Sequence, residues 1–301
     1  MDRLEAMSIL LEAVEAGSLS AAGRRLGMPL ATVSRKVSDL EARLGAQLLR
    51  RSSRKLTLTD AGQSYVLASK SILEQVAEAE RAAAGEYSEP RGDLTIAAPI
   101  VLGRLHVLPL ATAFLAAHSN ISIRLVQGDR LVNLQEEHVD LAIRIGALPD
   151  SGLTATRLGV IRRVVCGSPA YFASRGTPAH PDDLGAHDGV AYEGMTQPDG
   201  WVFRDGARSL SVAPRFRLRV NTTEAAIDAA IAGIGVTRVL SYQTVEAFAS
   251  GALATVLDAY EPDPWPVHLI YPARTLLPRK TRAFIDFVAP RLRERLRVGA
   301  P

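Results

Sequence analysis

The sequence has few residues that form covalent cross-links or large aromatic cores. It contains one cysteine, Cys166, which excludes an internal disulfide, and aromatic residues make up only 5% of its 301 residues. We therefore expect aliphatic cores, and the flanking residues "RRVVCGSP" predict a buried, unreactive thiol. The N-terminal stretch lacks the cationic start of a signal peptide, and no continuous run of about 18 apolar residues is present. These absences predict a cytoplasmic protein with no membrane partner.

The motifs that mark common enzyme classes are missing as well. The six histidines are scattered, and the chain has no HExxH motif, P-loop, nucleophile elbow or GxGxxG motif. His180 and His187, in a loop-rich stretch with three aspartates, form only a weak candidate for a metal site. The sequence therefore predicts a protein that is not an enzyme, with no catalytic residue, no metal and no cofactor.

What the sequence does contain is a concentrated block of positive charge. Between Arg24 and Lys55, nine Lys and Arg residues outweigh two acidic residues and give a net charge of +7. The whole chain carries only +3, so the remaining residues carry −4. A small basic block on a mildly acidic body predicts a polyanionic partner for one end of the molecule only.

The basic block overlaps a pattern of three helices. Apolar residues recur at helical spacing over 4–14 and predict a first helix that ends near Gly17. Ser20 is the expected N-cap of a short second helix that ends at Leu26, and a third helix is expected at or just after Pro29. Two short helices followed by a tight turn and a longer amphipathic helix are typical of a helix-turn-helix.

The third helix has two contrasting faces. Four apolar residues, separated by four, three and four positions, form one stripe that predicts burial against the first two helices. These residues are Val33, Val37, Leu40 and Leu44. Short hydroxyl side chains and cations occupy the first two turns of the opposite face, at Thr32, Ser34, Arg35 and Lys36. Because an α-helix fits the major groove, where such side chains reach base edges and phosphates, the helix is expected to bind double-stranded DNA.

A short hairpin is expected directly after the third helix. Residues 47–49 and 56–58 favour β-strands, and the segment between them is polar and basic. Cations at the tip of such a wing would contact the phosphate backbone and add affinity with little sequence information. Any one arginine is explained as well by an ordinary surface charge, but the order of the elements favours DNA. The expected DNA contacts are Ser20, Thr32, Ser34, Arg35, Lys36, Arg50, Arg51, Ser53, Arg54 and Lys55.

A long helix is predicted after the hairpin, from an N-cap at Thr59 to about Glu86. Its apolar positions follow coiled-coil spacing, with Ser69 as the one polar break. They are Tyr65, Ile72, Val76, Ala79 and Ala83. Packing against its own domain is the simpler explanation, but so narrow a seam favours pairing with the same helix of a second copy. The following "EYSEPRG" predicts a hinge or linker.

From Asp93 onward, strand-like and helical segments alternate. The stretches "DLTIAAP", "ISIRLVQ" and "VDLAIRIG" indicate strands, with helices expected over 101–117 and 131–137. A second set of strands begins at about Arg163, and the final "VHLIYP" and "RKTRAFIDFV" are expected to return to the first lobe. This alternation predicts βαβ units around mainly parallel sheets, in two lobes joined by two crossings.

Two parts of the chain resemble LysR-type transcriptional regulators. The first, similar to the winged helix-turn-helix of the family, is "EAGSLSAAGRRLGMPLATVSRKVSDLEARLGAQLLRRSSRKLTLTDAG". The second, similar to the effector domain of the family, comprises "CGSPAYFASRGTPAHPDDLGAHDGVAY" and "AAIAGIGV". The resemblance covers nearly the whole chain. It implies a homodimer or homotetramer that binds a specific DNA sequence and is controlled by a small-molecule effector.

The resemblance also implies an α+β / α/β multidomain fold. A winged helix-turn-helix over 1–59 would be followed by a linker and dimerisation helix over 60–90 and a two-lobed α/β effector domain over 91–301, like periplasmic binding proteins. The lobes would comprise 91–162 with 267–301, and 163–266. A free solute-binding protein is the alternative class; the basic N-terminal module and the missing signal peptide argue against it.

Two departures from the family pattern concern recognition. Leu30 and Ala31 stand where family members often carry Gln or Lys and then Pro or a small residue, so a polar contact at Leu30 is expected to be missing. From Ala98 to Val101 there is no hydroxyl, where many members have a Ser or Thr that binds an inducer carboxylate. Backbone amides at that helix start remain available to an anion.

A ligand in such a two-lobed domain is expected between the lobes, at strand ends and helix starts. The candidate effector contacts are Pro99, Ile100, Val101, Gln127, Arg144, Tyr192, Trp201, Phe203, Thr222 and Thr223. Arg144, which ends an apolar strand, is the first candidate for an anion contact, and a structural salt bridge is its alternative. The alternatives are core packing for Tyr192 and Trp201 and helix capping for Thr222 and Thr223.

Overall fold

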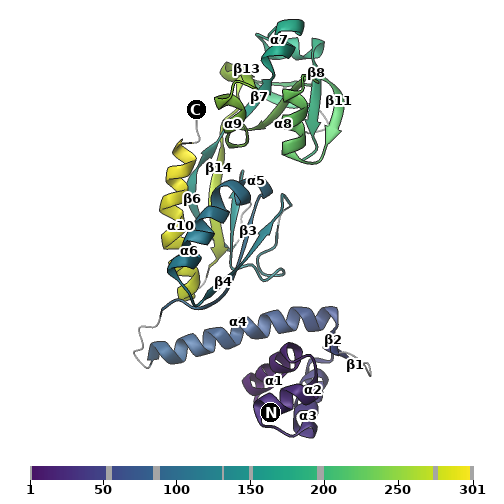
Figure 1. Ribbon diagram of the computed structural model, residues 1–301, viewed down its shortest axis with the longest axis vertical. Coiled ribbons are helices and arrows are strands. Elements are labelled where there is room, and N and C mark those ends of the chain that lie inside the picture. Colours follow the sequence, from purple (N-terminus) through teal and green to yellow (C-terminus); the bar gives the residue numbers. More distant parts are fainter. Residues whose placement is uncertain are drawn as a thin grey trace. The chain divides into compact units, whose positions relative to one another are not determined.

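The structure is a computed structural model of the 301-residue chain. It describes residues 2–51, 56–83, 89–130, 132–148, 152–194, 200–273 and 277–298. The chain forms two compact units (Figure 1). The first consists of Met1–Gly92 with Gln135–His138, and the second of Asp93–Leu134 with Val139–Pro301.

The first unit contains three helices, a two-stranded hairpin and a long helix (Figure 1). The elements are α1 (Arg3–Glu15), α2 (Leu19–Leu26), α3 (Leu30–Leu44), β1 (Leu49–Arg51), β2 (Leu56–Leu58) and α4 (Asp60–Ala83). In the hairpin, Leu49 pairs with Leu58 and Arg51 with Leu56 in antiparallel register. The predicted helices and wing are therefore present, although the first wing strand begins two residues later than the sequence indicated.

Side-chain caps set the starts of two helices. The Ser18 hydroxyl accepts a hydrogen bond from the Ala21 amide at 3.1 Å, so α2 begins after Ser18 and the predicted cap at Ser20 is wrong. Ser18 has the extended backbone that an N-cap requires, whereas Ser20 already lies inside the helix. The Thr59 hydroxyl accepts from the Gly62 amide at 2.9 Å, which confirms the predicted cap of α4.

A small aliphatic core joins the first three helices. Val33 and Val37 are fully buried and Leu40 is 1% exposed, so three of the four predicted stripe residues face this core. Leu44 is 41% exposed, so its predicted burial is wrong. It is the last residue of α3, directly before the C-cap Gly45. The residues of α1 and α2 buried in the same core are Ala6, Ile9, Leu10, Ala13 and Ala22.

The second unit contains two five-stranded sheets, one in each lobe (Figure 1). The first sheet has the order β4-β3-β5-β14-β6, and the second β11-β8-β12-β7-β13. The strands of the first sheet are β3 (Gly92–Ala98), β4 (Ile121–Gln127), β5 (Leu141–Ile145), β6 (Leu153–Ile161) and β14 (Trp265–Pro272). Those of the second sheet are β7 (Arg163–Gly167), β8 (Asp188–Tyr192), β11 (Arg215–Val220), β12 (Val236–Leu240) and β13 (Ala254–Val256). A separate hairpin is formed by β9 (Trp201–Asp205) and β10 (Arg208–Val212).

Both sheets are mixed, so the prediction of mainly parallel sheets is wrong. β3 pairs with β5, and β8 with β11 and β12, in parallel. By contrast, β14 pairs antiparallel with β5 and β6, and β7 with β12 and β13. The reason is that β7 and β14 each follow a crossing from the other sheet, whereas parallel pairing needs a crossover connection within one sheet. The return of β14 to the first sheet is as predicted.

Helices flank both sheets. Those of the first lobe are α5 (Ile100–Leu102), the π-helical turn η1 (Gly103–Val107), α6 (Leu108–Ala117) and α10 (Arg279–Val298). Those of the second lobe are α7 (Pro169–Arg175), η2 (Pro181–Ala186), α8 (Thr223–Ile231), η3 (Ser241–Gln243), α9 (Val245–Ala249) and η4 (Asp258–Tyr260). The predicted helix over 131–137 is wrong in its described part, 132–137, which is loop and turn. Val132 and Leu134 are both buried there, and a spacing of two does not place residues on one helix face.

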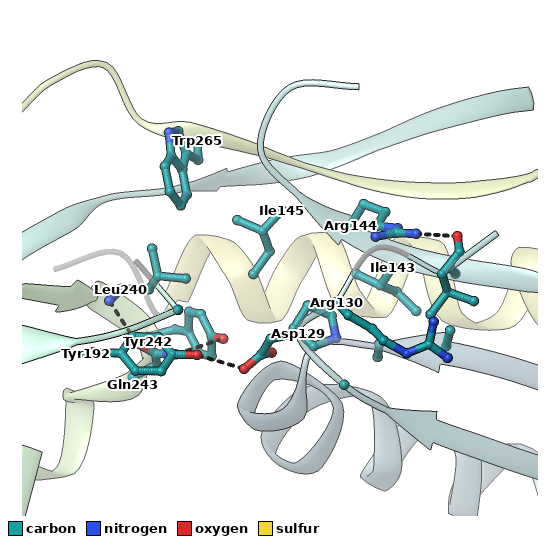
Figure 2. Close-up of a pocket in the computed structure, with 17 residues that line it drawn as sticks. Asp129, Arg130, Ile143, Arg144, Ile145, Tyr192, Leu240, Tyr242, Gln243 and Trp265 are labelled. Atoms are coloured by element: carbon teal, nitrogen blue, oxygen red, sulfur yellow. Dashed lines mark hydrogen bonds between the residues drawn. The ribbon is translucent and has the colours of Figure 1, made fainter. Parts of the chain in front are cut away.

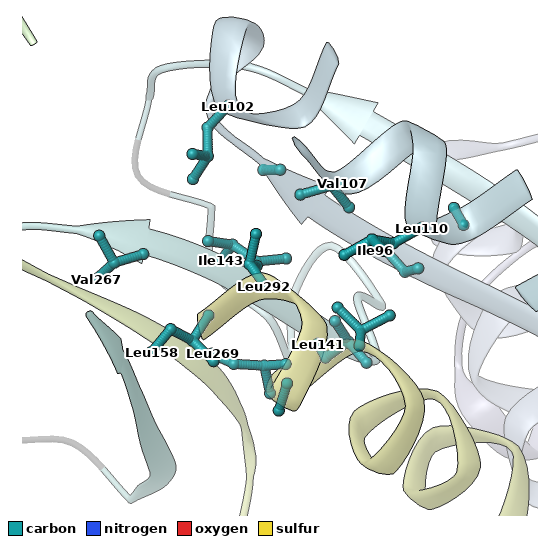
Figure 3. Packing of buried hydrophobic residues seen from close by; sticks show 14 of the residues in the cluster. Ile96, Leu102, Val107, Leu110, Leu141, Ile143, Leu158, Val267, Leu269 and Leu292 are labelled. Carbon is teal, nitrogen blue, oxygen red and sulfur yellow. The ribbon is translucent and has the colours of Figure 1, made fainter. Parts of the chain in front are cut away.

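The larger core lies between the first sheet and its helices. Figure 3 shows Leu102, Val107 and Leu110 on the helical side of this core, with Ile96 and Leu141 from the sheet. By length and composition alone, Ile100–Ala117 is long and apolar enough to cross a membrane. The apolar side chains of this segment that are buried pack in this core.

Candidate functional site

The exposed face of α3 carries several of the expected DNA contacts. Arg35 is exposed, and among the described residues no hydrogen bond or ion pair is found for its guanidinium. Thr32 and Ser34 are half-buried beside it in sequence. Lys36 instead forms an ion pair with Glu5 of α1, so its ammonium group is already engaged within the unit. Arg35 is therefore better placed than Lys36 for an external partner.

The backbone at the start of the wing is held against α3 and α4. A carboxylate oxygen of Glu41 accepts hydrogen bonds from the amides of Leu48 and Leu49, at 2.8 and 3.0 Å. A Cβ atom on Gly62 would lie 2.0 Å from the Leu48 carbonyl oxygen, so this close approach of α4 requires glycine. Arg50 follows in β1 with an exposed side chain. The anchoring fixes where this cation lies relative to α3.

Of the remaining expected DNA contacts, one is exposed on the surface, and the side chains of the others lie outside the part of the chain that the structure describes. Ser20 is exposed in the first turn of α2, and its hydroxyl lies 3.4 Å from that of Ser18. Ser53, Arg54 and Lys55 at the wing tip lie outside the described residues, as does the side chain of Arg51.

The predicted pairing seam of α4 has a covered and an open part. Tyr65 packs against the core of the first unit, and Val76 is half-buried. Ile72 is 40% exposed, and Ala79 and Ala83 are exposed. The C-terminal part of the seam therefore presents small and apolar side chains on the surface of the unit.

A cavity of about 180 Å³, here called the interlobe pocket, lies between the two lobes of the second unit (Figure 2). A cavity of about 150 Å³ accommodates benzene, so the interlobe pocket has room for a molecule with about one ring. The polar residues that line it are Asp129, Arg130, Arg144, Tyr192, Tyr242 and Gln243. Its larger apolar residues are Pro99, Val132, Ile143, Ile145, Leu240 and Trp265.

Asp129 connects the two lobes at this pocket. The Tyr192 hydroxyl, at the end of β8, donates a hydrogen bond to Asp129 Oδ2 at 2.8 Å. The Ile100 amide, at the start of α5, donates to Asp129 Oδ1 at 3.1 Å. Burial, and then the hydrogen bond to Asp129, raise the pKa of Tyr192 to about 12, so its hydroxyl stays protonated and remains a donor at neutral pH. Asp129, which accepts from both lobes, therefore joins them at this pocket.

Gln243 is held firmly on the side of the second lobe. Its Oε1 accepts a hydrogen bond from the Leu240 amide at 2.8 Å, and its Nε2 donates to the Tyr242 hydroxyl at 3.3 Å and to Thr223 Oγ1 at 3.4 Å. Burial raises the pKa of Tyr242 well above its ordinary value. These bonds give the polar groups on this side a fixed orientation.

The charges that line the interlobe pocket favour an anion. Arg144 Nη2 donates to the Val132 carbonyl oxygen at 2.6 Å, which holds the guanidinium at one end of the pocket. Figure 2 shows Arg130 beside it, Asp129 near the middle, and Tyr192 at the opposite end. Two cations and one carboxylate give the lining a formal net charge of +1.

Comparison with known families gives both units an assignment. Residues 4–63 match the family model described as "Bacterial regulatory helix-turn-helix protein, lysR family", and residues 88–293 match "LysR substrate binding domain". The chain belongs to the LysR family of transcriptional regulators. The predicted family, fold class and regulatory function are thereby confirmed.

Relatives of this LysR-type regulator match it over nearly its whole length. The uncharacterized HTH-type transcriptional regulator YhjC of Escherichia coli is 33% identical, covering 98% of this chain and 100% of the relative. An HTH-type transcriptional repressor of Pseudomonas aeruginosa is 34% identical, covering 96% and 92%. The full-length structure of the Vibrio cholerae virulence activator AphB has a TM-score of 0.60 at 27% identity, covering 95% and 98%. These relatives are regulators of transcription and include both a repressor and an activator.

The structure of this LysR-type regulator separates the ten predicted effector contacts into three groups. Pro99, Arg144 and Tyr192 line the interlobe pocket, and Ile100 and Thr223 contact residues that line it. The other five do not line it and are Val101, Gln127, Trp201, Phe203 and Thr222.

The residues outside the pocket have structural roles that the sequence left open. Trp201 and Phe203 are each 2% exposed in the core of the second lobe, and Val101 is buried in that of the first. The Thr222 hydroxyl accepts from the Ala225 amide and caps α8. Core packing is thus the observed role of Val101, Trp201 and Phe203, and capping that of Thr222, whereas Gln127 is exposed at the end of β4.

Several pocket residues were missed in the sequence. Asp129 and Arg130 follow β4 after Gly128, and polar residues just beyond a strand end were the available signal. Gln243 and Trp265 gave no comparable signal, because each comes close to the pocket only through the packing of distant segments.

Two other candidate sites of the LysR-type regulator have structural explanations. His187 Nδ1 lies 3.1 Å from the Tyr171 hydroxyl, and burial lowers the pKa of this imidazole. Among the described residues, no group of three or more His, Cys, Asp or Glu side chains is suited to a metal ion. Cys166 is fully buried in β7, and burial raises the pKa of its thiol to about 12, which agrees with the predicted unreactive thiol.

Proposed function

We propose that this LysR-type regulator responds to a small organic acid that binds in the interlobe pocket with its carboxylate at Arg144. The observation that carries the proposal is the combination of a one-ring volume with a lining of net charge +1. Guanidinium groups bind carboxylates through charge-assisted hydrogen bonds, often two in parallel. A carboxylate at this end would also be close to Arg130 (Figure 2).

The rest of the proposed ligand is apolar with a polar group at its far end. Ile143, Ile145 and Trp265 provide apolar walls, and small-molecule sites typically combine such walls with a few fixed polar groups. Tyr192 and Gln243 supply those groups on the side of the second lobe. Because the ligand would contact both lobes, its binding is expected to change their relative position and thereby the arrangement of the DNA-binding modules.

We also propose the DNA contacts, the oligomeric state, the cellular location and the domain limits that the sequence predicts. Duplex DNA would be read by α3, with Arg35 as the principal base contact and Arg50 and the wing tip on phosphates. The chain would act in the cytoplasm as a homodimer or homotetramer paired through α4. The domain limits would be 1–59, 60–90 and 91–301, with lobes of 91–162 with 267–301 and of 163–266.

Binding to full-length protein tests the effector class. Benzoate, benzamide and benzylamine have similar size and differ in charge, and calorimetric titration with each measures which charge the pocket selects. We expect benzoate to bind best. Arg144→Met should weaken it about tenfold or more, the usual scale for losing a hydrogen bond to a charged group.

Arg124→Met is the matched control, because Arg124 is exposed on β4 and does not line the pocket. It should leave benzoate affinity unchanged. Preferential binding of benzylamine or benzamide, or benzoate binding that Arg144→Met does not affect, would contradict the proposed effector class.

A further inference from the structure

A second and smaller cavity, of about 110 Å³, is built mainly from the first lobe. It lies among η1, the end of β6 and the C-terminal part of α10, with Val160, Ile161 and Leu296 as apolar walls. We call it the rear cavity. Tyr242 lines both the rear cavity and the interlobe pocket, but the two share no other lining residue, so they are separate sites.

Within the part of the chain that the structure describes, one cation of the rear cavity makes no ion pair. Arg295 is half-buried on α10, and among the described residues no hydrogen bond or ion pair is found for its guanidinium. Arg162 also lines the cavity, but Glu261 holds it through two hydrogen bonds of 2.8 and 2.9 Å. Because Arg295 is half-buried beside an apolar wall, its charge is screened less by water than that of a fully exposed arginine, and the site favours an anion.

A second polar group in the same cavity also has no hydrogen-bond partner among the residues that the structure describes. His106 Nε2 is buried and makes no hydrogen bond within the described residues, and the imidazole ring stands edge-on to Tyr242 at 5.6 Å. Burial, and then the charge of Arg295, lower the pKa of His106, so at neutral pH the imidazole is uncharged and carries one N–H. His106 lies in the π-helical turn η1, and such turns occur frequently at functional sites.

We propose that the rear cavity is a second ligand site, which binds a short aliphatic carboxylate between Arg295 and His106. One carboxylate would pair with the guanidinium of Arg295 and accept a hydrogen bond from His106 Nε2–H. The alkyl chain would contact Val160, Ile161 and Leu296. A volume of about 110 Å³ is below the roughly 150 Å³ that accommodates benzene, so the site selects a short chain and excludes a ring.

The surface beside the rear cavity supports the charge of this ligand. A neighbouring groove shares Val160 and Leu296 with the cavity and carries Arg157, Arg293 and Arg297. Clustered cations at the approach to a site raise the local concentration of anions. The groove therefore favours the arrival of a carboxylate over that of an amine.

Titration of the full-length protein with ¹³C-labelled butyrate, followed by NMR, tests the site. We expect saturable binding that butylammonium does not reproduce. Arg295→Met should weaken butyrate binding by about 10-fold to 100-fold, the range for losing a hydrogen bond to a charged group. Arg295→Lys, which keeps the charge, should retain most of the affinity. His106→Phe, which keeps the ring but removes the N–H, should also weaken binding, and it provides the readout if Arg295→Met does not fold.

Two controls make the result specific to the rear cavity. Arg291→Met removes an exposed positive charge from the same helix outside the cavity, and Arg144→Met changes only the interlobe pocket. Neither should affect the component of butyrate binding that Arg295→Met and His106→Phe weaken. The proposal is overturned if butyrate does not saturate the wild-type protein, if Arg291→Met weakens binding as much as Arg295→Met, or if Arg144→Met abolishes binding while Arg295→Met and His106→Phe leave it intact. The last outcome would place butyrate in the interlobe pocket.

Discussion

Replacing Arg35 with alanine tests the proposal that α3 reads DNA. Arg35 is exposed and has no protein partner among the described residues, so Arg35→Ala should leave folding stability within about 0.5 kcal/mol of wild type. A guanidinium that hydrogen-bonds a guanine edge contributes about 1–3 kcal/mol of discrimination. In a symmetric dimer both half-sites lose this contact, so the expected loss on the specific site is about 2–6 kcal/mol, or at least about 30-fold in affinity.

Fluorescence anisotropy with two duplexes of equal length separates base reading from charge attraction. One duplex carries the site located by footprinting, and the other has a random sequence. Arg35→Ala should lose its affinity mainly on the specific duplex. Arg43→Ala removes the same charge from the exposed last turn of α3 and serves as the control, with little effect on either duplex.

A salt series on both duplexes completes the test. Each phosphate contact that is lost reduces the slope of log K against log salt by about 0.9. If Arg35→Ala weakened both duplexes equally and reduced the slope by that amount for each subunit, Arg35 would be a phosphate contact and the base-reading assignment would be refuted.

Three further predictions follow from individual contacts. Gly62→Ala should lower the free energy of unfolding in urea by about 1–3 kcal/mol because its Cβ would clash with a backbone carbonyl, whereas Gly185→Ala, with no atom within 4 Å, should change it little. Because the pKa of Tyr192 is raised from its ordinary 10 to about 12, the contact with Asp129 stabilises the fold fully below pH 10 and less as pH rises towards 12. In urea titrations between pH 10 and 12, the free energy of unfolding should therefore fall less for Tyr192→Phe than for the wild type. Cys166 should react with a thiol reagent at pH 8 only after unfolding, and rapid labelling of the native protein would contradict its burial.

Sequence periodicity correctly predicted most of the residues that a single helix buries. Val33 and Val37 share one helix face by spacing alone, and both are buried. Capping was less predictable, because Ser18 and Ser20 are the same residue type and only the extended backbone at Ser18 selects the cap. The prediction of burial was wrong at Leu44. The periodic apolar pattern extends to this last residue of α3, but the residues that bury the rest of the stripe do not cover it.

The interlobe pocket was predictable only in part. Arg144 and Tyr192 stand at strand ends that the sequence reveals, and both line the pocket. Trp265 reaches it because β14 returns from the other lobe and pairs antiparallel with β5, with Val267 opposite Ile145. Periodicity within a segment carries no information about such a pairing.

The most direct test of the account joins the two units in one experiment. The affinity of the full-length protein for its footprinted DNA site is measured with and without an acid shown to bind in the interlobe pocket, for the wild type and for Arg144→Met. Without the acid, the wild type and Arg144→Met should bind the DNA site with equal affinity. Adding the acid should change the DNA affinity of the wild type only. An equal change in Arg144→Met, or no change in the wild type, would contradict the account.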